Sequence, residues 1–282
     1  MTTEPAGAGR PRFVVSRDGT PIAVFATGEG PPIILVHGTT ADHTTFRASG
    51  PLLARTFSVH AVDRRGRGAS GDAGDPYRIE REYEDLAAVA EAVAEDAGEP
   101  VDLMGHSYGG RCALGAAVLT DAIGRVVVYE GAPSPAGREG YRPAGVEQRI
   151  AELIRSGDRD EALATFFREV VRMPEPDLAA YRADPIWPIR AAAVHTTLRE
   201  MAGEGSPAAS LGALGRVEQP VLQILGGDSP EVFREATRAL DARLADGRIV
   251  VIDGARHAAH HTHVEPFVAS IRAFLARPPM AD

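Results

Sequence analysis

Short apolar runs alternate with longer amphipathic stretches along most of the chain. The apolar runs lie at residues 33–36, 58–62, 101–104, 126–129, 221–225 and 249–252. Since almost every position in them is apolar, these runs predict strands that are covered on both faces, as in a parallel sheet. The amphipathic stretches between them, notably 79–97 and 111–119, predict helices. This alternation predicts an α/β fold with a mostly parallel central sheet, right-handed crossovers and helices on both faces.

The N-terminal part departs from this alternation. Residues 1–11 are rich in Pro, Gly and Ala, which predicts a disordered lead-in. Two strand-like runs follow at 13–16 and 22–26, separated by the turn residues Asp18 and Gly19. Such a pair of runs predicts an antiparallel hairpin.

The alternation breaks a second time, between residues 133 and 215. Helical patterns at 145–155, 159–171 and 188–201 are divided there by proline-rich breaks at 173–176 and 184–188. No strand pattern is evident in this stretch. An all-helical insertion after the strand that ends at Glu130 predicts a lid. The expected organisation is therefore a core domain of residues 12–132 and 216–282 with a helical cap at 133–215.

Charge and composition narrow the class of protein. The chain has 282 residues, and 30 basic against 39 acidic side chains give a net charge of −9, which argues against a nucleic-acid partner. A single cysteine, Cys112, excludes an intramolecular disulfide and predicts a small buried side chain rather than a reactive thiol. No apolar run is long enough for a signal peptide or a membrane span. We expect a cytoplasmic protein without a membrane partner; its oligomeric state is open.

The pentapeptide GHSYG at 105–109 carries the clearest chemical signal. It follows the apolar run 101–104 and precedes a helix pattern, which fits the GxSxG nucleophile elbow. Glycines on both sides allow a tight strand-to-helix turn, in which strained backbone presents Ser107. A hydroxyl is a weak nucleophile near neutral pH unless a base accepts its proton, so Ser107 requires a histidine. The structural alternative is a turn or helix-capping serine.

Four motifs occur in the order found in a known superfamily. They are LVHGT at 35–39, DRRGRGAS at 63–70, GHSYGG at 105–110 and GARH at 254–257. From about Phe13 onward the chain resembles the α/β-hydrolase superfamily with a helical cap. The resemblance implies the α/β-hydrolase fold and a serine hydrolase that needs no cofactor.

The resemblance implies His257 as the base, because it follows the last strand and precedes a helix expected at 265–276. Three further histidines lie close by, His260, His261 and His263. A zinc cluster built from residues 257, 260 and 261 is the alternative, but no cysteine or HExxH motif supports a metal site. The extra histidines are expected near the mouth of the site.

The resemblance also implies an oxyanion hole made of the backbone N–H groups of Thr39 and Tyr108. Fixed donors of this kind stabilise a developing alkoxide without reorganisation. The hydroxyl of Thr39 or Thr40 could add a donor. His37 is expected to be a structural hydrogen bonder, and the loop that contains Asp63 and Arg64 is expected to shape the site without a direct role.

The acid of the triad has two candidates, since the superfamily places it after either of two strands. At the usual place stands LGGDSP, residues 225–230, in which Asp228 is one position early and Ser229 takes the expected place. At the earlier place Glu130 ends an apolar strand, as in haloalkane dehalogenases. A buried carboxylate needs a partner, and a protonated histidine is one. We favour Glu130, because Asp228 or Ser229 is explained as the N-cap of a helix that starts near Pro230.

The expected function is hydrolysis of an ester or related acyl bond in a small, largely apolar molecule through an acyl-enzyme. Carbon–carbon bond hydrolysis, acyl transfer, and a non-hydrolytic ligand-binding or biosynthetic role on the same fold remain alternatives. Six side chains of the expected cap are candidates to line the substrate pocket or to pack the cap. They are Phe166, Phe167, Met173, Tyr181, Trp187 and His195.

Overall fold

The structure is a computed structural model that describes residues 10–72, 76–135 and 142–276. Its centre is an eight-stranded sheet with the order β1-β2-β4-β3-β5-β6-β7-β8. Strand β2 pairs antiparallel with β1 and β4, and all other pairs are parallel. The strands are β1 (Arg12–Val15), β2 (Pro21–Thr27), β3 (Pro32–Val36), β4 (Ser58–Val62), β5 (Val101–His106), β6 (Ile123–Tyr129), β7 (Val221–Gly226) and β8 (Gly247–Ile252).

The predicted α/β fold, its mostly parallel sheet and the N-terminal hairpin are therefore confirmed. The predicted lead-in over residues 1–11 lies almost entirely outside the described residues. None of the helices in the described part of the chain is long and apolar enough to cross a membrane.

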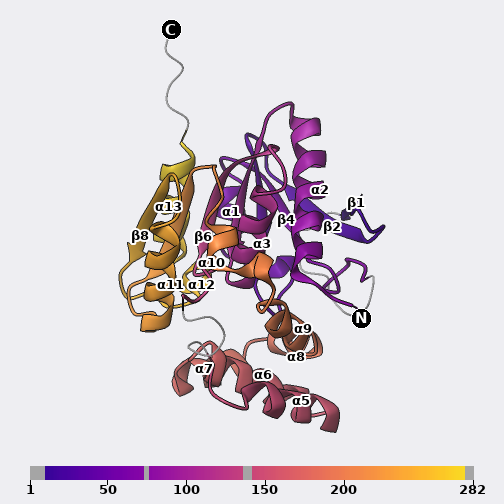
Figure 1. The fold of residues 1–282 in the computed structure, drawn as a ribbon, viewed down its shortest axis with the longest axis vertical. Coiled ribbons are helices and arrows are strands. Elements are labelled where there is room, and N and C mark those ends of the chain that lie inside the picture. The colour runs from indigo at the N-terminus through magenta and orange to yellow at the C-terminus, as the bar shows by residue number, and fades with distance from the viewer. Residues whose placement is uncertain (1–9, 73–75, 136–141, 277–282) are drawn as a thin grey trace.

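Helices cover both faces of the sheet (Figure 1). One apolar cluster joins α2 (Ile79–Ala97) and α3 (Tyr108–Ala117) to one face, and a second joins α1 (Gly50–Leu53) and α13 (Val264–Leu275) to the other. The remaining core helices are η1 (His43–Phe46), η3 (Pro207–Ala209), α10 (Leu211–Leu214), α11 (Glu231–Asp241) and α12 (Ala259–Thr262).

Between β6 and β7 the chain forms a helical insertion, which Figure 1 shows gathered at one end of the molecule. Its elements are α5 (Val146–Ser156), α6 (Arg159–Thr165), the π-helix η2 (Phe166–Val170), α7 (Glu175–Arg182), α8 (Trp187–Ala192) and α9 (Thr196–Gly203). The insertion has its own apolar cluster, separate from those of the sheet. In contrast, η3 and α10 pack on the cluster of α2 and α3.

Two single helices predicted in the insertion are each divided in the structure. The helix predicted at 159–171 changes to π-helical turns at Phe166, a change that apolar spacing does not reveal. The helix predicted at 188–201 is interrupted after Ala192. There the ring of His195 and the hydroxyl of Thr196 bond to backbone carbonyls, an alternative to helical pairing.

The proline-rich stretch at 173–176 divides two helices, as predicted. Its last residues also start α7, which the sequence analysis did not predict, because Pro176 lies in the first turn, where a missing N–H costs nothing. One further prediction is wrong. Strand β8 is not covered on both faces, since the side chains of Ile249 and Val251 are 37% and 50% exposed. It is one of the two edge strands of the sheet.

Candidate active site

Ser107 lies in a sharp turn between β5 and α3. Its backbone has φ 55° and ψ −125°, a conformation that a non-glycine residue adopts only under strain. A Cβ on Gly105 would lie 2.4 Å from the carbonyl oxygen of Gly109, and one on Gly109 would lie 2.4 Å from that of His37. Glycine is therefore required at both positions. Helix α3 begins directly after Ser107, earlier than predicted.

Glu130 follows β6, and its fully buried carboxylate has three donors around it. Oε2 lies 2.6 Å from Nδ1 of His257. Oε1 accepts the backbone N–H of Gly226 at 2.8 Å and the hydroxyl of Ser229 at 2.5 Å. Hydrogen bonds to a charged acceptor are the strong ones, and they offset the cost of burying it. The arrangement fixes the carboxylate against the histidine.

Asp228, the alternative acid, is exposed and does not reach His257 in the described structure. Its backbone N–H donates to the carbonyl of Ala255 at 2.9 Å. The prediction that Asp228 or Ser229 caps the next helix is wrong, because α11 has Pro230 at the N-cap and no side-chain cap bond. Instead, the 225–230 loop supplies two of the donors to Glu130.

The loop that carries His257 is held by two residues that the sequence did not single out. Nε2 of His106 lies 2.9 Å from the carbonyl oxygen of His257. The hydroxyl of Tyr129 donates to the carbonyl of Arg256 and accepts the N–H of Ala259 at 2.8 Å. Both are polar side chains at strand ends, next to Ser107 and Glu130. Their position beside the two candidate site residues is the sequence feature that could have pointed to them.

The two expected oxyanion donors lie in the wall of one narrow cavity with Ser107 and His257. The volume of this cavity is about 30 Å³, enough for little more than a water molecule. As the first residue of α3, Tyr108 has a backbone N–H without an intrahelical acceptor. Thr39 lies on the loop after β3. The hydroxyl of Thr40 donates to the carbonyl of Thr39 at 2.7 Å, so it serves the loop.

His37 and Arg64 fix the loop that carries Thr39. Nε2 of His37 accepts the backbone N–H of Arg64 at 3.0 Å, so Nδ1 donates to the carbonyl of Gly38 at 2.8 Å. Burial, and then the charge of Arg64, lower the pKa of His37 well below its usual value, which keeps the ring neutral. The guanidinium of Arg64 donates to the carbonyls of His37 and Gly38. Asp63 accepts the backbone N–H of His43 at 2.8 Å and shapes the next loop.

Buried ion pairs join the helical insertion to the core. Arg64 and Arg67 each contact both Glu82 on α2 and Glu200 on α9. All four side chains are almost completely buried. Removing one member of such a network leaves an uncompensated buried charge, so the network fixes α9 against the core.

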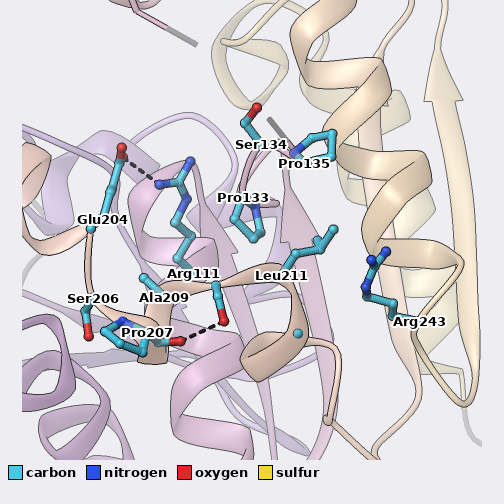
Figure 2. Close-up of a pocket in the computed structure, with 13 residues that line it drawn as sticks. Arg111, Pro133, Ser134, Pro135, Glu204, Ser206, Pro207, Ala209, Leu211 and Arg243 are labelled. Atoms are coloured by element: carbon cyan, nitrogen blue, oxygen red, sulfur yellow. Dashed lines mark hydrogen bonds and ion pairs between the residues drawn. The ribbon is translucent and has the colours of Figure 1, made fainter. Parts of the chain in front are cut away.

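A larger cavity of about 540 Å³ opens beside the narrow one and shares His257 with it. Its wall comes from α7 and neighbouring residues on one side and from residues 254–263 on the other. Another cavity of the same volume is lined by the ion pair of Arg111 and Glu204, by α10 and by residues 133–135 (Figure 2). Neither Ser107 nor His257 lines that one, so the cavity that shares His257 is the candidate substrate site.

Four of the six candidate pocket residues line either the narrow cavity or the larger cavity that shares His257. Phe166 lines the narrow cavity, and Phe167, Met173 and Tyr181 line the larger one. Trp187 is buried and its ring N–H donates to Asp160 at 2.5 Å. His195 is exposed.

The additional histidines lie at the larger cavity. His260, His261 and His263 all line it. Within the described ranges, no three His, Cys, Asp or Glu side chains are grouped so that they could hold a metal ion. Cys112 is fully buried, as predicted, and burial raises the pKa of its thiol.

Comparisons with known proteins identify the family. The sequence pattern of the alpha/beta hydrolase family matches residues 33–270. The chain belongs to the alpha/beta hydrolase family. A solved alpha/beta hydrolase from Sphaerobacter thermophilus is 32% identical, with a TM-score of 0.78, covering 92% of this chain and 100% of that one.

Curated relatives include two proteins named pimeloyl-[acyl-carrier protein] methyl ester esterase. The one from Neisseria meningitidis is 27% identical over 86% of this chain and 76% of its own length. The one from Aeromonas hydrophila is 27% identical over 90% of this chain and 99% of its own length. The chain is therefore an enzyme of the alpha/beta hydrolase family, and at the level of the family it groups with ester hydrolases.

Proposed function

We propose that the chain is a cofactor-independent serine hydrolase with the triad Ser107, His257 and Glu130. The contact of 2.6 Å between Nδ1 of His257 and Oε2 of Glu130 carries this proposal. It supports a ring whose Nε2 is free of a proton and able to accept one. Ser107 and His257 also line the same narrow cavity. The substrate is an ester or a related acyl compound of a small, largely apolar molecule.

In the proposed reaction, Ser107 Oγ attacks the carbonyl carbon and its proton passes to His257 Nε2. The N–H groups of Thr39 and Tyr108 stabilise the oxyanion. His257 then protonates the leaving alcohol. A water molecule, deprotonated by His257, attacks the acyl-enzyme and releases the acid together with free Ser107.

We also propose that the insertion at 133–215 acts as a cap through its part up to α9, since η3 and α10 at its end pack on the core, and that 12–132 and 216–282 form the catalytic core. The larger cavity supports this, because its wall combines side chains of the insertion with the loop of His257. Phe167, Val171 and Met173 give it an apolar side. Cytoplasmic location and the absence of a nucleic-acid or membrane partner stay predictions from the sequence.

Substitution of Ser107 tests the proposal. Ser107→Ala is expected to lower kcat for short p-nitrophenyl esters by about 10⁶, the loss seen when a serine protease nucleophile is removed. A fluorophosphonate should label the parent protein at Ser107 and leave the variant unlabelled. Ser270→Ala, on the exposed side of α13, is the matched control. Circular dichroism checks that both variants fold.

Turnover of Ser107→Ala within about tenfold of the parent would contradict the serine mechanism. Labelling without hydrolysis would favour acyl transfer or cleavage of a carbon–carbon bond on the same triad. A folded parent protein that is neither labelled nor active on any ester would favour a non-hydrolytic role.

A further inference from the structure

Arg190 of α8 places a buried guanidinium in the wall of the larger cavity. The residue is 8% exposed. Its two terminal nitrogens donate to neutral oxygens of the core, the hydroxyl of Thr45 at 2.8 Å and the carbonyl of Thr39 at 3.5 Å. Its Nε has no hydrogen-bond partner among the described residues. A guanidinium has five N–H donors, so much of its donor capacity is unused.

The other buried arginines of the described residues provide an internal comparison. Each of them has a carboxylate within ion-pair distance, while no ion pair of the described residues includes Arg190. The paired ones are Arg64, Arg65, Arg67 and Arg111. A buried charge without a counter-ion is costly, because neither water nor an opposite charge stabilises it. Arg190 therefore departs from the rule that this fold otherwise follows.

His260 is a second polar side chain in the same wall with no partner. It is 2% exposed, and neither ring nitrogen has a hydrogen-bond partner among the described residues. Burial, followed by the neighbouring histidines and Arg190, lowers the pKa of His260 well below its usual value. The ring is neutral and retains one N–H donor. Two buried side chains with unused hydrogen-bonding capacity, Arg190 through its Nε and His260 through its ring, thus line one cavity.

We propose that Arg190 binds a carboxylate on the acyl part of the substrate, so that the enzyme hydrolyses monoesters of short dicarboxylic acids. This inference rests on the proposed function of Ser107. The guanidinium bonds to Thr39, which lies in the wall of the narrow cavity with Ser107, so the carboxylate and the ester carbonyl are held at two ends of one short chain. Phe167, Val171 and Met173 cover the apolar part between them. Arginine suits this task, since its planar fork matches a carboxylate.

The competing explanation is that Arg190 only ties α8 to the loops of Thr39 and Thr45. The two explanations differ in what they predict for matched substrates. A tie would affect all esters equally, whereas a carboxylate site distinguishes an anionic ester from a neutral one of the same length.

The test compares mono-4-nitrophenyl glutarate with 4-nitrophenyl valerate, which differ in a carboxylate against a methyl group at the far end. The parent protein is expected to show a kcat/KM for the glutarate ester at least about tenfold higher. Arg190→Gln should lower kcat/KM for the glutarate ester by about 10- to 100-fold, the loss of a hydrogen-bonded charge partner, and change the valerate ester less than about threefold. Arg190→Lys should keep part of the preference.

Arg168→Gln is the matched control, because Arg168 lies in the same insertion, pairs with Glu161 and Glu175, and lines neither cavity. It should leave the ratio of the two esters unchanged. Equal kcat/KM values in the parent protein would overturn the carboxylate site. An equal loss of kcat/KM on both esters in Arg190→Gln would overturn it as well. Arg190 would then only hold α8 against the loops of Thr39 and Thr45.

Calorimetry with glutarate tests the carboxylate site by binding alone, so its result does not depend on whether Ser107 hydrolyses esters. The parent protein is expected to bind glutarate at least about tenfold more tightly than Arg190→Gln does. Absence of binding to the parent protein would refute the carboxylate site, even if neutral esters are hydrolysed and a fluorophosphonate labels Ser107. Binding without any ester hydrolysis would refute the proposed function and retain the site.

Discussion

Glu130→Gln gives the sharpest test of the acid. The change keeps the size of the side chain but replaces one oxygen by an NH₂ group, which must face one of three partners. Gly226 offers a backbone N–H to Oε1, and a backbone donor cannot become an acceptor. The amide oxygen is therefore expected at Gly226 and Ser229, and its NH₂ group at Nδ1 of His257.

An NH₂ group beside Nδ1 favours the histidine tautomer that carries its proton on Nε2. That tautomer cannot accept the proton of Ser107. In a serine protease triad the corresponding amide replacement lowers kcat by about 10⁴, which corresponds to about 5.5 kcal/mol in the activation barrier. We expect a loss of that size for Glu130→Gln. Asp228→Asn should change kcat by less than about twofold, since Asp228 is exposed and its carboxylate does not contact His257.

The assay is the steady-state kcat for p-nitrophenyl butyrate, together with the rate at which a fluorophosphonate labels Ser107. Both variants are first compared with the parent protein by circular dichroism and urea unfolding. A kcat for Glu130→Gln within about tenfold of the parent would refute the role of Glu130. A large loss in Asp228→Asn with normal activity in Glu130→Gln would assign the acid to Asp228.

Two other variants test the base and the ion-pair network. His257→Ala should lower kcat by about 10⁶, while His195→Ala, at an exposed position that lines neither cavity, should change it less than about threefold. A chelator should leave the parent protein active. Loss of activity with a chelator and its recovery with zinc would assign the histidines near His257 to a metal site. Glu200→Gln should lower the free energy of unfolding in urea by about 3–5 kcal/mol, because Arg64 and Arg67 lose a buried partner. The control Glu175→Gln, at an exposed ion pair, should lower it by less than about 1 kcal/mol. Equal effects of the two variants would contradict a structural role of the network.

The sequence predicted the sheet well because buried parallel strands are apolar at nearly every position. The strands predicted at 58–62 and 101–104 correspond to β4 and β5, and the helix predicted at 79–97 has the bounds of α2. The insertion was harder, because its helices are short and are ended by local side-chain bonds, as at His195 and Thr196. Exposure of β8 depends on which strand lies at the edge, and apolar content alone does not give strand order.

For the candidate site, a local motif singled out Ser107, and the resemblance to a family singled out His257. The sequence did not show which polar side chains contact one another in the folded protein. The sequence assigned Ser229 a helix cap, while its hydroxyl donates to a carboxylate that is 99 positions away in the chain. Arg190 was not singled out either, because every basic side chain of this protein is an arginine and only the structure shows which of the buried ones lack a carboxylate.

The register of β6 and β7 explains how an acid after β6 reaches a histidine after β8. Tyr129 is paired with Ile224, so Glu130 lies beside the end of β7. The loop that usually carries the acid in this family follows that same strand. The backbone N–H of Glu130 donates to the carbonyl of Ile224 at 3.2 Å, and Gly226 donates back to its side chain at 2.8 Å. A Cβ on Gly226 would lie 2.6 Å from Oγ of Ser229, so the close packing of this loop on the carboxylate requires glycine there. The carboxylate of Glu130 and the 225–230 loop therefore form one unit. An acid placed on this loop instead of at Glu130 could not use the two donors that the loop now offers to the Glu130 carboxylate.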